Sequence, residues 1–376
     1  MSARVLILGA GFGGLELATV LSEELGDDAG VTLLEAGDAF VFGYSKLDVL
    51  FGRAAPGEVR LPYSSFAKPG VRLLRERVTA IDPEARSVTT DRGTHAGDVL
   101  VVALGADYDY EATPGLEESR ADFYSVAGAE RLRETLASFA GGRAVVGACG
   151  APYKCPPAPS EAALLLHDHL SERGLREASE LLLVLPFDTP VPPSPDTSAV
   201  LLDAFAERGI EFLSARRVAA VDAGRRILTL DDGSELEHDL FLAVPRHRAP
   251  EVVRASGLAE DDYVRVDPDT LATPYPGVYA VGDVAAVGVP KAGVFSEGAA
   301  RTVAGAILAE LRGDPAPPPY DRRGGCYVEL GGGLVGRVDV DFGSGPRPTG
   351  TFHGPSAELA AEKRLFGAAR RARWFG

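Results

Sequence analysis

Residues 5–14 read V-L-I-L-G-A-G-F-G-G, and they set the architecture of the first part of the chain. Four apolar residues in a row predict a buried parallel strand, and the glycines after it match the pattern G-x-G-x-x-G. A helical segment, residues 15–25, then runs to Gly26, and a second apolar strand, residues 31–34, ends in Glu35. This order of strand, glycine turn, helix, strand and acid is the full context of a dinucleotide-binding βαβ unit.

The glycines and the acid of this unit have separate tasks. Gly9 permits the tight turn, Gly11 lets the backbone approach a pyrophosphate, and Gly14 lets the helix pack closely on the strand. The helix N-terminus favours the phosphate charge, and Glu35 is placed to accept hydrogen bonds from a ribose diol. The alternative is a glycine-rich turn without a ligand. The presence of every element favours the dinucleotide site.

The composition excludes several other classes of protein. A chain of 376 residues has room for roughly two or three domains. Its 38 basic and 54 acidic residues leave a formal charge of −16, which argues against a nucleic-acid partner. Three cysteines do not make a secreted disulfide scaffold, and the six histidines do not cluster as metal ligands. No apolar run approaches the ~20 residues of a membrane-spanning helix, and the first strand begins at Arg4, which leaves no room for a signal peptide. We therefore expect a cytoplasmic protein.

Two distant stretches complete the first site. Residues 98–105 read D-V-L-V-V-A-L-G, an apolar strand that runs into a glycine turn. Residues 273–283 read T-P-Y-P-G-V-Y-A-V-G-D, a strand that ends in Gly-Asp. Together with the N-terminal unit, they resemble the motifs of the two-dinucleotide-binding-domain flavoproteins, the pyridine nucleotide-disulfide oxidoreductases. That superfamily includes disulfide reductases, type II NADH dehydrogenases and sulfide:quinone oxidoreductases.

The resemblance implies an α/β fold with two Rossmann-like dinucleotide-binding domains. In this fold the FAD-binding domain is split around the second Rossmann unit, and a small C-terminal region follows. We place the first half of the FAD-binding domain at residues 1–108 and the second Rossmann-like domain at residues 109–245. The second half of the FAD-binding domain then covers residues 246–318, and the C-terminal strand and helix region covers residues 319–376.

The resemblance also implies FAD as the cofactor and assigns residues to it. Asp283, after Gly282, would hold the ribityl chain, and the backbone of Val78 would meet the adenine. Ala103 and Gly105 belong to the first of the two distant motifs and line the same site.

The second Rossmann unit keeps its strand but not its glycines. The strand at residues 144–148 is followed by C-G-A-P-Y-K-C-P-P, residues 149–157, without a third glycine at the helix entry. A side chain and two rigid prolines would crowd a pyrophosphate, and each proline removes an amide donor. The next strand, residues 181–185, ends in Pro186 rather than in an acid placed for a ribose. The sequence therefore predicts a fold unit that has lost its NAD(P)H site.

Two cysteines of this unit differ in their setting. Cys149 ends an apolar strand, and we expect it to pack in the core, since free cysteine is among the most buried residue types. Cys155 lies in a proline-rich loop before a helix that we expect to begin near Ser160, a plausible N-cap. Lys154 and the helix N-terminus would both lower the thiol pKa and favour a reactive thiolate.

The segment around Cys155 carries a closer resemblance. Residues 154–161 read K-C-P-P-A-P-S-E and resemble the R-C-P-P-G-P-Y-E segment of the flavoprotein subunit of flavocytochrome c sulfide dehydrogenase, a relative of sulfide:quinone oxidoreductases. In that family this cysteine lies over the flavin and pairs with a second one in a C-Y context, here Cys326 and Tyr327. A third cysteine, present in many sulfide:quinone oxidoreductases, has no counterpart. The resemblance implies a Cys155/Cys326 redox pair acting on sulfide or a related small sulfur species.

Two further site residues follow from the resemblance, each with an alternative. Glu161 lies where the related family has a glutamate proposed as proton acceptor, but an acid in a first helical turn also favours the helix dipole. Lys291 follows the Gly-Asp strand, where the family places a lysine near the pyrimidine end of the flavin, and a cation there stabilises the anionic reduced ring. A solvated loop lysine is the alternative at this position.

The last segment, residues 356–375, predicts a basic helix tipped by Trp374 and Phe375. In quinone-reducing relatives a C-terminal amphipathic region rests on the membrane near the quinone pocket, which would make this protein peripheral on the inner face of the membrane. The alternative is a helix docked on the core, with both aromatic side chains buried and its arginines paired with the acidic body.

Three functions are open at this point. The first is a FAD-dependent oxidoreductase that oxidises sulfide or a related sulfur species and passes electrons to a quinone or a redox-protein acceptor. The second is an NAD(P)H-dependent quinone, disulfide or persulfide reductase. The third is a flavoprotein electron-transfer subunit that acts only with a redox partner protein.

Overall fold

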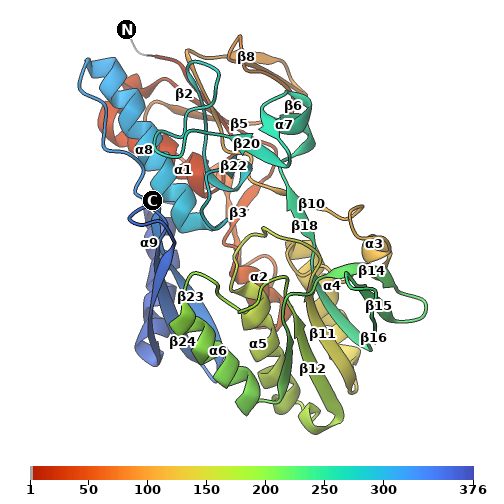
Figure 1. Ribbon diagram of the computed structural model, residues 1–376. Coiled ribbons are helices and arrows are strands. Elements are labelled where there is room, and N and C mark those ends of the chain that lie inside the picture. Colours follow the sequence, from red (N-terminus) through yellow and green to blue (C-terminus); the bar gives the residue numbers. More distant parts are fainter. Residues whose placement is uncertain (1–2) are drawn as a thin grey trace.

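The structure, a computed structural model, describes residues 3–376 and contains two parallel sheets, which lie in the upper and lower parts of Figure 1. The upper sheet has five parallel strands. In sheet order they are β21 (Val278–Ala280), β9 (Val99–Val102), β1 (Val5–Leu8), β2 (Val31–Glu35) and β5 (Val71–Arg75). Because β21 joins strands from residues 5–102, the first unit is built from two separated parts of the chain. The predicted split of the first unit is thus confirmed.

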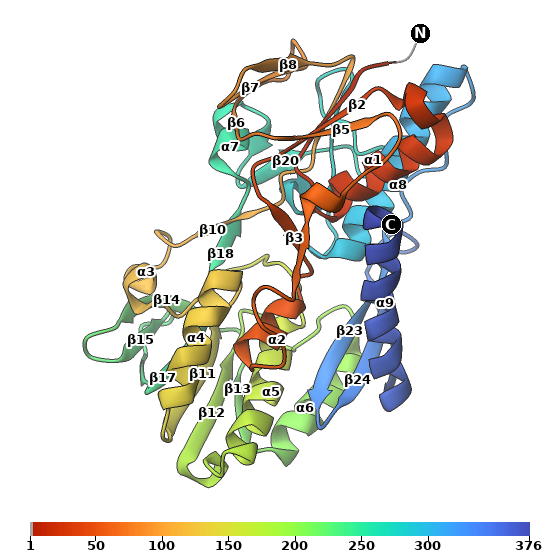
Figure 2. The same cartoon turned by 180° about the vertical axis from the view of Figure 1, so that it is seen from behind.

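Helices α1 (Phe12–Leu25) and α8 (Gly293–Arg312) pack side by side against this sheet, as Figures 1 and 2 both show. Every residue of β1 is buried, as expected for a strand that is covered on both faces. Helix α1 begins directly after Gly11, three residues before the expected start, so Gly14 lies inside its first turn.

The second sheet also has parallel strands and carries the second unit. In sheet order they are β13 (Ile210–Leu213), β12 (Ser179–Val184), β11 (Gly142–Ala148) and β17 (Leu240–Val244). The helices of this unit are α4 (Val126–Ser138), α5 (Ala158–Glu172) and α6 (Pro195–Glu207). Helix α5 begins at Ala158 with Pro157 at the N-cap, so the expectation of a cap at Ser160 is wrong: Ser160 is buried within the first turn.

Short elements connect and flank the two units. The chain passes between them through an antiparallel pair, β10 (Asp107–Asp109) and β18 (Arg246–Arg248), seen in Figure 1 between the two sheets. Helix α2 (Ser45–Leu50) belongs to the N-terminal part of the chain but packs on α4 of the second unit. The remaining elements are β3 (Ala39–Val41), β4 (Arg60–Pro62), β6 (Val78–Asp82), β7 (Ser87–Thr90), β8 (Thr94–Ala96), α3 (Leu116–Ser119), β14 (Val218–Asp222), β15 (Ile227–Leu230), β16 (Glu235–Glu237), α7 (Glu251–Ala255), β19 (Ala259–Glu260), β20 (Tyr263–Arg265) and β22 (Ala285–Ala286).

The C-terminal region is a three-stranded antiparallel sheet followed by one long helix. Its strands are β23 (Arg323–Gly331), β24 (Leu334–Asp341) and β25 (Thr349–Ser356), and its helix is α9 (Ala357–Phe375). Strand β23 packs on α5, and α9 runs back to α1, so the chain ends beside the first unit (Figure 2). No helix among residues 3–376 is both long and apolar enough to cross a bilayer.

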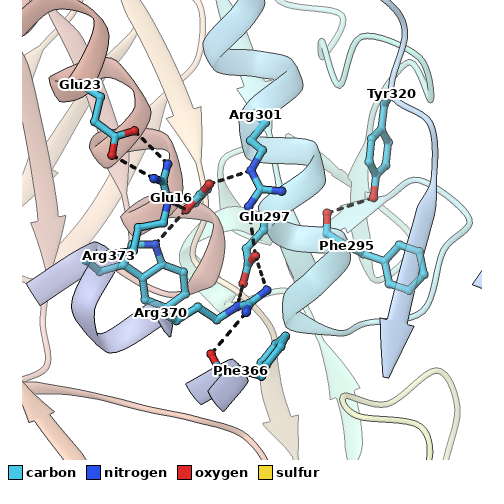
Figure 3. Close-up of polar contacts among 10 residues, drawn as sticks. Glu16, Glu23, Phe295, Glu297, Arg301, Tyr320, Phe366, Arg370 and Arg373 are labelled. Atoms are coloured by element: carbon cyan, nitrogen blue, oxygen red, sulfur yellow. Dashed lines mark hydrogen bonds and ion pairs between the residues drawn. The ribbon is translucent and has the colours of Figure 1, made fainter. Parts of the chain in front are cut away.

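The end of α9 is docked on the first unit through ion pairs with two buried glutamates (Figure 3). Arg373 donates a hydrogen bond of 2.9 Å to Glu16 of α1, and Arg370 donates one of 2.8 Å to Glu297 of α8. Trp374 is completely buried, donates its indole N–H to Glu16 and packs edge-on against Phe12. The docked alternative is therefore correct for Trp374, which is not exposed for insertion into a membrane.

Candidate active site

A cavity of about 710 Å³ lies where the two units and the C-terminal region meet. This volume is in the range of ligand-binding pockets. With one exception, every site residue predicted from the sequence lines it: Gly9, Gly11, Glu35, Val78, Ala103, Gly105, Cys155, Glu161, Gly282, Asp283, Lys291 and Cys326. The exception is Gly14, which lies behind the cavity wall in α1.

The three glycines of the N-terminal turn are needed for different reasons. A Cβ atom on Gly14 would lie 1.9 Å from the carbonyl oxygen of Gly9, and one on Gly9 would lie 2.4 Å from that of Ala103. Both positions therefore exclude a side chain because the backbone is too close. A Cβ on Gly11 would meet no protein atom within 4 Å, since this glycine faces the cavity. The turn thus leaves open space where a dinucleotide phosphate is expected.

Glu35 fixes the turn from the next strand. Its carboxylate accepts hydrogen bonds from the backbone N–H groups of Ala10 at 2.9 Å and Gly37 at 2.7 Å. It also lines the cavity, so its free lone pairs are available to a ribose diol.

Asp283 presents a half-buried carboxyl group to the same cavity. One of its oxygens has no hydrogen-bond partner among the described residues, and burial raises its pKa. A buried carboxyl oxygen without a partner is costly, and a polyhydroxyl chain would satisfy it. Gly282, with φ of 79°, makes the turn that places it.

Lys291 is not a solvated loop residue. Its side chain is buried, it donates to the carbonyl oxygen of Asp283, and it lies 3.4 Å from the ring centroid of Tyr263. Burial lowers its pKa to about 8, an effect that the nearby Asp283 opposes. The cation expected at the cofactor site is therefore held inside the cavity.

Cys155 and Cys326 line this cavity although they are far apart in the chain. Cys155 follows the turn after β11, and Cys326 lies on β23, which packs on α5. Both are half-buried free thiols, with no bond between them in this structure. Burial raises the pKa of the Cys326 thiol to about 12, and it raises the pKa of Cys155 as well. The third cysteine, Cys149, is buried in the core as predicted, and burial raises its pKa to about 12.

The expectation that Lys154 lowers the pKa of Cys155 is wrong. The Lys154 ammonium points to the carbonyl oxygen of Ala106, at 2.9 Å, and lies 4.2 Å from the ring centroid of Tyr108. Burial dominates the thiol, and the cations that oppose this rise in its pKa are Lys363 and Lys46. Neighbouring residues in a loop need not direct their side chains to the same place, so adjacency in the sequence was a poor guide.

Glu161 is buried beside the thiols, with 1% of its surface exposed. One carboxylate oxygen accepts the backbone N–H of Glu329 at 2.9 Å, and the other has no partner among residues 3–376. Burial raises its pKa to about 7, although Lys363, 4.0 Å away, opposes the shift. A carboxyl group with this pKa exchanges protons near neutral pH, as a general acid or base must.

Two cavity residues have no sequence motif and were not predicted. Lys46 comes from α2 and Lys363 from α9, and both ammonium groups reach the cavity. Lys363 pairs with Glu329, which Arg53 also binds, at 3.1 Å. One signal was available: the chain has only five lysines among its 38 basic residues, and four of them line this cavity.

A buried aromatic side chain lies in the turn that follows β11 of the second unit. Tyr153 is buried after β11, and its ring packs against Tyr124 and Phe187. The turn is therefore formed by aromatic packing and prolines, in agreement with the absence of the third glycine.

Residues 3–306 match the family model described as pyridine nucleotide-disulphide oxidoreductase. The chain belongs to this family. The mitochondrial sulfide:quinone oxidoreductase of Mus musculus is 24% identical over 366 residues, 93% of this chain and 80% of that protein. An NADH dehydrogenase-like protein of Mycobacterium tuberculosis is 31% identical over 306 residues, 75% of this chain and 73% of that one.

The fold of this pyridine nucleotide-disulphide oxidoreductase also matches a solved structure. The sulfide:quinone oxidoreductase from the bacterium Aquifex aeolicus superposes with a TM-score of 0.85 at 23% sequence identity. The match covers 99% of this chain and 92% of that one. Membership of this family makes the protein an FAD-dependent oxidoreductase. The cavity agrees with this cofactor, because its glycine turn is open and one Asp283 oxygen has no partner among the described residues.

Proposed function

We propose that this flavoprotein oxidises sulfide or a related sulfur species through a Cys155/Cys326 redox pair and passes the electrons to a quinone or another acceptor. The observation that carries the proposal is that both cysteines, which are 171 positions apart in the chain, line the FAD cavity. Cys149, the remaining cysteine, is packed in a separate part of the core. The similarity to sulfide:quinone oxidoreductases over most of the chain supports the same substrate class.

The FAD site would be formed by residues from three segments. Gly9, Gly11 and Gly14 would receive the pyrophosphate on the turn before α1, and Glu35 would bind a ribose diol. Asp283 would hold the ribityl chain, and the backbone of Val78 would meet the adenine. Lys291 would lie at the flavin end of the cavity. Bound FAD would supply the acceptor for one electron pair at a time.

In the oxidised protein Cys155 and Cys326 would be joined by a disulfide. Hydrosulfide attacks one sulfur of this bond, forms a persulfide on it and releases the other cysteine as a thiolate. The sulfur of the substrate is thereby oxidised, and the disulfide takes up the electron pair. Glu161, with its free carboxylate oxygen at the cavity, accepts the proton of the bound sulfur species. Its pKa near 7 lets it accept and release this proton at neutral pH.

A second cavity, of about 1110 Å³, is the candidate binding place for the electron acceptor. It lies between α2, the end of α5, the β23–β24 turn and α9. Tyr44 and Lys363 line both cavities, so an acceptor in the second one would lie directly behind the wall of the FAD cavity. We propose this cavity as the entry for a quinone.

Trp374 cannot provide a contact with a membrane surface, because its side chain is buried. The exposed face of α9 is the better candidate, because Leu365 has 67% of its surface exposed and lies between Arg364 and Arg371 along the helix. Leu334, at the β23–β24 turn beside the second cavity, is also exposed. Apolar side chains flanked by arginines suit an anionic lipid surface.

An NAD(P)H-dependent reductase is the second candidate function. The NADH dehydrogenase-like relative favours it, since its identity of 31% exceeds the 24% of the sulfide:quinone oxidoreductase, although over fewer residues. The buried Tyr153 and the missing glycine favour the sulfur reaction instead.

Anaerobic reduction of the bound flavin separates the two. The proposal predicts that sulfide bleaches the oxidised flavin absorbance within the mixing time of a manual titration, whereas NADH and NADPH do so slowly or not at all. Rapid bleaching by NADH together with inertness to sulfide would reverse the assignment.

A further inference from the structure

The lysines of this protein are concentrated at one place. The chain uses arginine for nearly all its basic positions, yet Lys46, Lys154, Lys291 and Lys363 line the FAD cavity. Lysine differs from arginine in being a compact point charge that suits small anions rather than planar bidentate ones. Lys363 pairs with the carboxylate of Glu329, and Lys291 donates to the backbone carbonyl oxygen of Asp283. Lys46 and Lys154 donate to neutral oxygens, of Tyr108 and Ala106, and neither has a carboxylate within hydrogen-bonding distance among residues 3–376.

Lys46 and Lys154 meet at one tyrosine. The Lys46 ammonium donates to the Tyr108 hydroxyl oxygen at 3.5 Å, and the Lys154 ammonium lies 4.2 Å from the centroid of the same ring. Tyr108 donates its own proton to the carbonyl oxygen of Tyr124, so its oxygen is free to accept from Lys46. Lys46 comes from α2 and Lys154 from the loop of Cys155, and the fold therefore brings two cations together from distant segments.

No carboxylate forms an ion pair with either lysine among residues 3–376. Burial lowers the pKa of Lys46 to about 8, and repulsion by Lys154 adds to the effect. Asp283, Asp107 and Asp122 oppose the fall in the pKa of Lys154 from a greater distance, and the Asp122 carboxylate already accepts from Tyr110 at 2.8 Å and Ser125 at 2.6 Å. Two half-buried like charges without a carboxylate partner are unfavourable, and an anion between them would remove the repulsion.

Of the two lysines, Lys46 is the one whose charge acts on the Cys155 thiol. Among the cations that lower the pKa of Cys155, Lys363 is held by Glu329, whereas the contact of Lys46 within the described chain is the long one to Tyr108. Glu161, which raises the pKa of Cys155, bears the opposite charge. A negatively charged reagent near Cys155 is therefore attracted by Lys46.

We propose that Lys46 and Lys154 form an anion subsite beside Cys155 that takes a small sulfur monoanion, either hydrosulfide or the terminal thiolate of a persulfide or polysulfide. The inference rests on the proposed function for the identity of the ligand. It goes further in naming the residues that select a charged sulfur species over a neutral thiol.

The rate at which Cys155 is alkylated tests the positive charge of the subsite and does not require a measurement of enzyme activity. The FAD-loaded protein is reduced, freed of reductant under argon and treated with iodoacetate, an anion, or iodoacetamide, its neutral counterpart. Peptide mass spectrometry gives the rate at Cys155 for each reagent. The iodoacetamide rate reports thiolate content, so the ratio of the two rates reports attraction of the anion.

We expect Lys46→Gln to lower the ratio of iodoacetate to iodoacetamide rate by roughly three- to tenfold, the effect of one nearby partly buried charge, and Lys154→Gln to lower it by less, because the Lys154 ammonium points to Ala106. Lys68→Gln is the matched control, because Lys68 is the one lysine that does not line the cavity. Its ratio should equal that of the wild type. An unchanged ratio in Lys46→Gln and Lys154→Gln would overturn the subsite.

If Cys155 resists both reagents, halide binding decides. Crystals of the holoprotein soaked in bromide should show an anomalous peak in contact with the Lys46 and Lys154 ammonium groups, and Lys46→Gln should lose it. A wild-type crystal without this peak would contradict the proposal. The proposed function is judged separately. If the ratio falls in the variants but the wild-type flavin does not respond to sulfide, sulfide oxidation is refuted and the anion subsite stands. If sulfide bleaches the flavin but the ratio is unchanged, the subsite is refuted and sulfide oxidation stands.

Discussion

The backbone N–H of Cys155 donates a hydrogen bond of 2.8 Å to the carbonyl oxygen of Lys291. Lys154 and Lys291 also form a short parallel bridge, so the loop that carries the thiol is fastened to the loop that carries a cation of the FAD site. Cys155 has φ of 51°, a conformation that is uncommon for residues other than glycine. The hydrogen bond to the other unit stabilises this conformation and fixes the thiol relative to the cofactor cavity.

The backbone at Cys155 leads to a prediction about stability. Cys155→Gly removes the side chain but suits a positive φ, whereas Cys155→Val places a β-branched residue in a strained conformation. We expect the glycine variant to have the higher Tm, by roughly 2–6 °C, although valine buries more apolar surface. Thermal unfolding of the two holoproteins checks this. Equal Tm values, or a more stable valine variant, would show that the strain at this position is unimportant.

Substitutions at two glycines of the N-terminal turn should have different effects on stability and on FAD binding. In Gly14→Ala the new methyl group would collide with the backbone of Gly9, so we expect a lower Tm and weak FAD binding together. In Gly11→Ala it would meet only the cavity, so the protein without FAD should keep its Tm while its affinity for FAD falls by at least about tenfold. Thermal unfolding of the deflavinated proteins and titration with FAD measure the two effects. Full FAD affinity in Gly11→Ala would mean that the pyrophosphate does not lie there.

Glu161 predicts a pH dependence of stability. Its pKa is raised by burial from 4.5 to about 7, so between these values the folded protein holds a proton that the unfolded chain has lost. The free energy of unfolding therefore falls as pH rises through this window, by roughly 3 kcal/mol at most. Glu161→Gln cannot ionise but can still accept the N–H of Glu329.

The Tm of Glu161→Gln should accordingly rise relative to the wild type between about pH 5 and about pH 8. Glu172→Gln, at the exposed end of the same helix, is the control and should follow the wild type throughout. A constant difference between Glu161→Gln and the wild type over this range would indicate that Glu161 is already ionised at pH 5.

The exposed face of α9 predicts the outcome of a lipid-binding measurement. We expect Leu365→Glu to reduce co-sedimentation with vesicles that contain anionic lipid by about fivefold or more, because it places a charge in the apolar contact. Leu202→Glu, the same substitution at an exposed leucine of α6, should have no effect. Equal sedimentation of the two variants would remove α9 as the membrane contact.

The sequence predicted the fold well because its signals are local. The strand, glycines and acid of residues 5–35 lie within one βαβ unit, and the return of residues 278–280 to the same sheet followed from a strand ending in Gly-Asp. The gathering of Cys155, Cys326 and the FAD residues in one cavity followed from the family resemblance rather than from any spacing rule.

The parts that could not be predicted depend on side-chain direction and long-range packing. Lys154 precedes Cys155 in the chain but turns to Ala106, and the cation with the largest effect on the Cys155 pKa is Lys363, which is more than two hundred residues away. Trp374 ends a basic helix, a pattern that predicts membrane contact, but it is buried and donates its indole N–H to Glu16, near the other end of the chain. Neither partner has a local sequence signature.

The central claim is that sulfide reduces the flavin through Cys155 and Cys326, and anaerobic titration with sulfide tests it most directly. The flavin absorbance of the oxidised wild-type protein should bleach on addition of sulfide. Cys149→Ser should behave like the wild type, since this thiol is buried elsewhere in the core, and Cys155→Ser and Cys326→Ser should keep their oxidised spectra. Bleaching that persists in both of these variants would contradict the cysteine mechanism, and a wild-type protein that does not bleach would contradict sulfide oxidation itself.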